Sequence, residues 1–172
     1  MKGKAMIHLC DSLTKRTSNL LEGARQEAKS RRHLYVGPEH LLLVLLAESG
    51  GLTPKIFSHL GVDLQEIHQA VETTLIRQES EIGVIKRIRM HLPTPIKASR
   101  LLSPPRKRLN RRAKGVMTRA RGEASALHHR YVGTEHVLLS LVYEDAGAMS
   151  QLLTERGLSR EGIRQVVTSL LV

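Results

Sequence analysis

Apolar side chains recur with a helical period from Thr14 onward. One face of this stretch carries Leu20, Leu21, Ala24 and Ala28, and charged residues occupy most of the other positions. Thr14 precedes the pattern, where its hydroxyl is suited to accept a hydrogen bond from a free N–H of the first turn. The pattern therefore predicts a helix that starts after Thr14 and ends near 31–32, where cations favour the negative end of the helix dipole.

A second helix is predicted to begin at Gly37-Pro38, because proline is well tolerated at the first helical position. Glu39 follows in the first turn, where the helix dipole favours a carboxylate. The run Leu41 to Leu46 is apolar on nearly every side of a helix. We expect this helix to be central and buried, and to close at Gly50-Gly51.

Two further helices are predicted in the same part of the chain. Thr53-Pro54 is expected to open a short helix that runs to about Leu60, with Thr53 as its cap. Asp63 begins a capping-box pattern for a fourth helix. The inner face of that helix is predicted to carry Leu64, Ile67, Val71 and Leu75.

The stretch 33–46 returns 96 residues later as 129–142, with nine of its fourteen positions identical. Such self-similarity indicates an internal duplication. Each copy is predicted to contain a helix, a central helix, a short helix and a final helix, over about 13–78 in repeat one and about 110–172 in repeat two. A unit of this size is marginally stable alone. We therefore predict an all-α fold in which two pseudo-symmetric four-helix repeats pack into a single domain, 1–172.

Residues 79–109 interrupt the helical pattern with four prolines and are predicted to form a long basic connector with little regular structure. The formal charge of +11 belongs to this region, since ten cations and no acid lie between Ile82 and Arg112. The other 17 cations nearly balance the 16 acids of the chain. A nucleic acid, an acidic partner or solvent are the alternatives for this charge. The candidate contacts are Lys86, Arg87, Arg89, Arg106, Lys107, Arg108, Arg111 and Arg112.

Composition narrows the classes of protein to consider. Aromatic residues are absent between Ser58 and Arg130, so the basic segment lacks a platform for stacking single-stranded bases. No apolar run approaches the roughly 18 residues of a membrane span, and no secretory signal is visible. The single cysteine, Cys10, fits a reducing compartment. We expect a cytoplasmic protein, or a stromal one in a plastid.

The element Tyr-Val-Gly-x-Glu-His-x-Leu-Leu-x-Leu, with a Glu-Ala helix before it and Leu-Gly-Val-Asp-Leu after it, resembles the Clp N-terminal domain. This is the double-repeat helical module at the head of Clp/AAA+ unfoldases, and the resemblance covers 13–78 and 109–171. Two departures stand out: the connector is longer and more basic than usual, and Pro38 stands where Thr is common. No Gly-x-x-x-x-Gly-Lys-[Ser/Thr] phosphate loop occurs in the sequence, so we expect no nucleotide cofactor bound in that manner.

The resemblance implies a non-catalytic protein-binding module that recruits substrates or adaptors to a Clp unfoldase or protease, or modulates assembly of that complex. In some relatives a carboxylate and a threonine bind phosphorylated arginine on substrates marked for degradation. Carried over by position, the residues are Thr14 with Glu39 and Asn110 with Glu135, the first pair being the better site. The alternative is that both carboxylates only cap the central helices. A basic nucleic-acid-associated protein and the N-terminal part of a Clp ATPase are the other two hypotheses.

Four histidines flank the central helices, namely His33, His40, His129 and His136. Their seven-residue spacing matches no known metal-ligand pattern, and no cysteine lies near them in the sequence. We expect each histidine to form a local hydrogen bond that holds the loop to the helix, with no metal and no catalytic residue.

Overall fold

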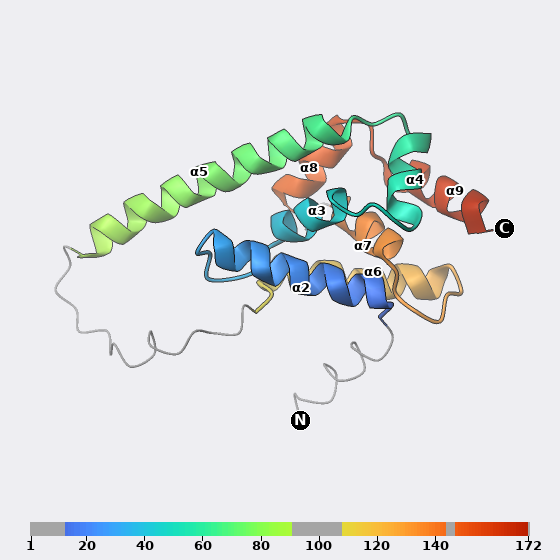
Figure 1. Ribbon diagram of the computed structural model, residues 1–172, viewed down its shortest axis with the longest axis horizontal. Helices are drawn as coiled ribbons and strands as arrows, with labels where there is room; N and C mark the ends of the chain where they lie inside the picture. The colour runs from blue at the N-terminus through green and yellow to red at the C-terminus, as the bar shows by residue number, and fades with distance from the viewer. Residues whose placement is uncertain (1–12, 91–107, 144–146, 172) are drawn as a thin grey trace, which may run out of the picture.

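The computed structural model describes residues 13–90, 108–143 and 147–171, and the elements found there are helices (Figure 1). Repeat one contributes α2 (Lys15–Ser30), α3 (Pro38–Leu46), α4 (Leu52–His59) and α5 (Leu64–Met90). Repeat two contributes α6 (Arg111–Ala126), α7 (Thr134–Leu141), α8 (Ala148–Glu155) and α9 (Arg160–Leu171). The predicted all-α class and the order of helices in each copy are confirmed.

The first helix of each repeat is capped by the residue that the duplication aligns. Thr14 Oγ1 accepts from the backbone N–H of Thr17 at 3.2 Å, and Asn110 Oδ1 accepts from that of Ala113 at 2.8 Å. These caps satisfy backbone donors that the first turn leaves free. The predicted N-cap at Thr14 is therefore confirmed.

The two repeats share one aliphatic core. α3 and α7 lie against each other at its centre, α4 packs on α9, and α5 packs on α8 (Figure 1). Each short helix and each final helix thus contacts an element of the other repeat. The largest fully buried side chains come from both copies and include Leu41, Leu42, Leu45, Leu138, Leu139 and Leu141. Since each repeat covers the apolar surface of the other, the pair forms one domain, as predicted.

Two predicted boundaries in repeat one were wrong. α3 ends at Leu46 with Ala47 as its cap, four residues before the Gly50-Gly51 pair that was expected to close it. α4 begins at Leu52, because Gly51 adopts φ 97° and serves as the N-cap. Thr53 consequently lies inside the first turn, where it caps nothing, and its hydroxyl donates to Thr134 Oγ1 of the other repeat at 3.0 Å.

The predicted connector was also wrong over its first third, because α5 continues to Met90. Residues 79–90 contain no proline, the first one being Pro93, so nothing in them prevents the helix from continuing. The buried face of α5 carries Ile67, Val71 and Leu75. Beyond it the helix extends past the rest of the molecule (Figure 1). The remaining predicted connector, 91–107, lies outside the described residues.

None of the helices in the described ranges combines the length and the apolar character needed to cross a bilayer.

Candidate functional site

The segment before each central helix is joined to the other repeat by backbone hydrogen bonds. The N–H of Thr14 donates to the carbonyl of Val132 at 3.1 Å, and the Thr17 hydroxyl donates to the same oxygen at 2.8 Å. In the mirrored position the N–H of Asn110 donates to the carbonyl of Val36 at 2.8 Å. Each N-cap therefore lies beside the loop that leads into the central helix of the opposite copy.

This crossing offers a second pairing of the candidate site residues beside the predicted one. The sequence register paired Thr14 with Glu39 and Asn110 with Glu135, but Val132 leads to Glu135 and Val36 leads to Glu39. We call the two resulting places the Thr14 mouth, with Glu135, and the Asn110 mouth, with Glu39. Register along the chain could not reveal this, because a duplicated unit packs equally well within itself or across its partner.

Both carboxylates are folded back over the start of their helices, where Glu135 is buried and Glu39 is partly buried. The side chain of Glu39 is 12% exposed and that of Glu135 is 8% exposed. A Cβ atom on Gly37 would lie 1.9 Å from Glu39 Oε1, and one on Gly133 would lie 2.1 Å from Glu135 Oε1. Only glycine leaves room for this fold-back, which explains the glycine two positions before each glutamate.

Burial raises the pKa of both Glu39 and Glu135, while a hydrogen bond from each residue's own backbone N–H opposes the rise. The two mouths differ in the other charged side chains that act on the pKa of each glutamate. Arg112 lowers the pKa of Glu39, whereas the carboxylate of Glu48 raises that of Glu135. Glu48 is itself paired with Arg16 at 3.5 Å. The Asn110 mouth thus has a nearby guanidinium, and the Thr14 mouth has a second carboxylate with its own cation.

The four histidines form two identical hydrogen-bonded pairs. His40 Nδ1 accepts from the backbone N–H of Gly37 at 3.0 Å, so the neutral ring carries its proton on Nε2 and donates it to His33 Nδ1 at 2.7 Å. In repeat two, His136 makes the same bonds to Gly133 at 2.9 Å and to His129 at 2.8 Å. The predicted local role, in which each pair fastens the loop to the helix, is confirmed.

Burial, together with the neighbouring His33 and His129 rings, lowers the pKa of His40 and of His136 to about 4. Both inner rings are therefore neutral at pH 7. This matters for their neighbours, because a neutral ring gives Glu39 or Glu135 no countercharge.

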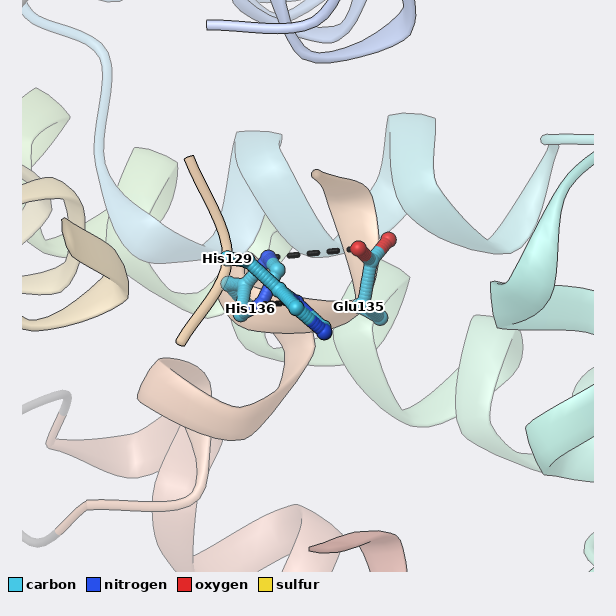
Figure 2. Close-up of side chains that lie close together, drawn as sticks. All are labelled: His129, Glu135 and His136. Atoms are coloured by element: carbon cyan, nitrogen blue, oxygen red, sulfur yellow. Dashed lines mark hydrogen bonds and ion pairs between the residues drawn. The ribbon is translucent and has the colours of Figure 1, made fainter. Parts of the chain in front are cut away.

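His129, Glu135 and His136 lie close together, with one ligand atom of each within 4.8 Å of the others (Figure 2). Such a trio has the chemistry of a metal site. However, the Nδ1 lone pair of His136 already accepts the Gly133 N–H, and its Nε2 carries the proton donated to His129. Metal binding would require the loss of the hydrogen bond that caps α7. The trio is therefore better explained by its role in capping the start of that helix.

The predicted basic contacts are divided between separate elements. Arg111 and Arg112 lie in the first turn of α6, and Arg108 directly precedes it with an exposed side chain. Lys86, Arg87 and Arg89 lie on the last turns of α5, of whose side chains nothing is described, and Arg106 and Lys107 lie outside the described residues, as does Cys10.

Sequence reasoning missed Arg16 and Glu48 at the Thr14 mouth. One signal was present, since Arg16 and Arg112 occupy equivalent positions in the two copies. In the structure both guanidiniums lie near a glycine before the short helix: a Cβ on Gly51 would be 2.9 Å from Arg16, and one on Gly147 would be 3.0 Å from Arg112. The two repeats therefore share this arginine and its place beside the glycine that precedes the short helix.

Known proteins share this architecture. The Clp repeat (R) N-terminal domain family matches residues 12–92 and 108–172. The chain belongs to this family. The matched ranges contain both repeats with their central helices and leave out the proline-rich part of the connector.

Relatives in sequence are much longer proteins. The chain is 35% identical over 158 residues to the chaperone protein ClpB of Oceanobacillus iheyensis, and 33% identical to the negative regulator of genetic competence ClpC/MecB of Bacillus subtilis. Each alignment covers 92% of this chain and 17% of the relative. The chain thus corresponds to about a sixth of those proteins.

Solved structures share the fold. The N-terminal domain of the ClpV1 ATPase from an Escherichia coli type VI secretion system is 19% identical, with a TM-score of 0.66 over 97% of this chain and 90% of that chain. The Hsp104 N-terminal domain of Candida albicans is 18% identical, with a TM-score of 0.65 over 92% and 91%. At these identities the likeness extends to the helical fold alone.

Proposed function

We propose that this chain is a non-catalytic protein-binding module of the Clp unfoldase and protease system, which recruits substrates or adaptors through its two mouths. The observation that carries the proposal is the pair of buried carboxylates, Glu39 and Glu135, each at the start of a central helix beside the N-cap of the other repeat. Family membership supports the same role, because the relatives carry this module on unfoldase subunits.

The chemistry of the mouths suits a basic side chain, above all arginine. A carboxylate can accept two parallel hydrogen bonds from a guanidinium, and burial strengthens that interaction. The helix start beside it favours an anion, so a phosphorylated arginine would satisfy both features at once. Thr14 and Asn110 are the residues placed to meet the phosphate, and Glu135 and Glu39 those placed to meet the guanidinium.

The proposal is tested by titrating the purified chain with free phosphoarginine in a calorimeter. The double variant Glu39→Gln/Glu135→Gln keeps the shape of both side chains and removes both charges, so binding should weaken at least tenfold. Glu22→Gln is the matched control, because Glu22 is 60% exposed and pairs only with Arg25 on the surface. Equal binding by the double variant and the control, both folded by circular dichroism, would refute the proposal.

The crossed geometry gives a sharper version of the same test. If Thr14 and Glu135 share a ligand, then Thr14→Ala and Glu135→Gln should show non-additive effects on affinity, whereas Thr14→Ala and Glu39→Gln should be additive. The opposite result would restore the pairing that the sequence register suggests.

A nucleic-acid role is the second candidate, and it is favoured by ten cations between Ile82 and Arg112 without an acid. Affinity for a DNA or RNA duplex should then fall steeply with salt and vanish when the basic residues of 86–112 are neutralised. We place this candidate second, because it makes no use of the buried carboxylates. If the chain is the N-terminal part of a Clp ATPase, the binding chemistry of the mouths is unchanged.

A further inference from the structure

A shallow groove of about 290 Å³ lies where the end of α3 meets the start of α5. We call it the repeat-one groove. Its lining is Leu46, Ala47, Leu64, Gln65, His68 and Gln69. The two leucines are half-buried on the core, and the alanine, glutamines and histidine are exposed. The groove therefore has an apolar floor, a polar rim and room for about one large side chain.

The duplication shows what the same place holds in repeat two. Ala47 of the groove corresponds to Tyr143, 96 residues later. The Tyr143 ring lies between two guanidiniums, with Arg160 at 4.8 Å and Arg119 at 5.2 Å from its centroid. Its hydroxyl donates to the buried carboxylate of Glu123. Repeat two thus holds an aromatic side chain at this position through two guanidinium contacts and a hydrogen bond.

Repeat one has none of these three side chains at the equivalent positions. Gly23 stands at the position of Arg119, Ala47 at that of Tyr143, and Leu64 at that of Arg160. The carboxylate is retained, because Glu27 corresponds to Glu123. Glu27 is one-third exposed and pairs with Arg31 at 2.7 Å. Repeat one consequently has the apolar floor of the groove, and no aromatic residue stands at the position of Tyr143.

We propose that the repeat-one groove binds a tyrosine side chain presented by a partner protein, in the place that Tyr143 occupies in repeat two. Its size favours a single side chain, since small-molecule pockets have volumes of roughly 300–1,000 Å³. Leu46 and Leu64 form the apolar floor under the ring, and Ala47 leaves free the position that Tyr143 fills in repeat two. This surface is separate from the two mouths and does not depend on the function proposed for them.

No aromatic residue of the given sequence is left over for the groove. The sequence contains one Phe and three Tyr. Phe57 is buried in the core, Tyr143 serves repeat two, and Tyr35 and Tyr131 precede the central helices. The sequence outside the described residues contains no Phe, Tyr or Trp that could reach back to the groove. A partner tyrosine is therefore the occupant that the chemistry selects.

The proposal is tested by nuclear magnetic resonance with N-acetyl-L-tyrosinamide as the probe and N-acetyl-L-alaninamide as its control. The tyrosine probe should shift the amide signals of Leu46, Ala47, Gln65 and Gln69, and the alanine probe should not. In the variant Ala47→Tyr the groove is filled from within, so the affinity for the tyrosine probe should fall at least tenfold. Ala47 is exposed, and the substitution therefore leaves the core intact.

Tyr143→Ala provides the converse arm. It opens the equivalent place in repeat two, and the tyrosine probe should then also shift the signals of Val142, Glu161 and Gln165. If Tyr143→Ala fails to fold, the Ala47→Tyr comparison decides alone. Absence of shifts at the groove, or equal shifts in Ala47→Tyr, would overturn the proposal. So would the same shifts on raising the protein concentration without a probe, because the occupant would then be a second copy.

Discussion

The two repeats agree at their centres and differ at their outer ends. Both keep the histidine pair, the folded-back carboxylate, and a left-handed residue after the first helix, Arg32 with φ 57° and His128 with φ 59°. At the outer end, repeat two buries Glu123 at 4% exposure, whereas its counterpart Glu27 keeps a one-third exposed side chain. The shared part builds the interface between copies. The divergent part is a closed polar cluster in repeat two and an open groove in repeat one.

The divergence also changes how each final helix is held. In repeat two, Arg160 and Arg164 of α9 reach Glu123 at 3.2 and 3.1 Å. In repeat one, Arg31 of α2 contacts Glu72 of α5, and both side chains are partly exposed. A buried carboxylate with several donors is strongly coupled to its partners, and an exposed pair is screened by solvent.

The largest expected effect tests the difference between the two outer ends directly. Glu123→Ala leaves two guanidiniums and the Tyr143 hydroxyl without their common acceptor, and we expect it to lower the free energy of unfolding by about 3 kcal/mol. Glu27→Ala removes only a partly exposed pair and should cost about 1 kcal/mol or less. Urea denaturation of both variants measures the difference. Equal losses would show that the two outer ends are energetically alike.

Acidification should act on both copies together. The pKa of His40 and of His136 is lowered to about 4 in the folded chain, from 6.5. Between these values the unfolded state binds more protons, so stability is complete above pH 6.5 and is lost as the pH falls toward 4. Glu39 and Glu135 oppose this in part, because burial raises their pKa and protonation then favours the folded state.

We expect a net loss of about 2 kcal/mol between pH 7 and pH 5. His40→Gln and His136→Gln should each remove about half of this pH dependence, since the two pairs have the same geometry. Denaturation midpoints at the two pH values measure it. A pH dependence that disappears completely in one variant would mean that only one copy responds.

The third prediction concerns the glycine before each central helix, and here the two repeats should behave alike. Gly37→Ala and Gly133→Ala each place a Cβ against a carboxylate oxygen, which must leave its backbone N–H, at a cost of about 1 to 2 kcal/mol. Neither glycine has a positive φ, so backbone strain plays no part. Adding Glu39→Ala to Gly37→Ala removes the clash, and the double variant should be as stable as Glu39→Ala alone. A further loss in the double variant would contradict this cause.

Much of this fold follows from local patterns in the sequence. The apolar period predicts the helices, and side chains such as Thr14 and Ser159 mark their starts, Ser159 accepting from the N–H of Gly162 at 3.0 Å. What the pattern lacks is information on contacts between copies. The pairing of Thr14 with the Glu135 loop depends on backbone atoms, which carry no sequence signature. The Glu123 cluster brings Tyr143 and α9 arginines together only through the tertiary packing.

The end of α5 shows the other limit. Prolines from Pro93 onward and the density of cations suggested an irregular connector, although the residues before Pro93 are compatible with a helix. Within the described residues α5 therefore continues to Met90, over a stretch that contains no helix-breaking proline.

The smallest expected effect concerns α6 and α2, the helices that carry Glu123 and Glu27. Gly122 of α6 is exposed and a Cβ there would meet nothing within 4 Å, while the equivalent residue of α2 is the exposed Gln26. Gly122→Ala should therefore stabilise the chain by about 0.5–1 kcal/mol, because alanine loses less backbone entropy in a helix. Gln26→Gly should cost a similar amount in repeat one. If both hold by thermal denaturation, α6 has the weaker intrinsic helix propensity at this position, and its buried Glu123 contacts compensate for it. If Gly122→Ala is neutral, the tertiary contacts of repeat two already fix the backbone there, and the asymmetry lies in packing alone.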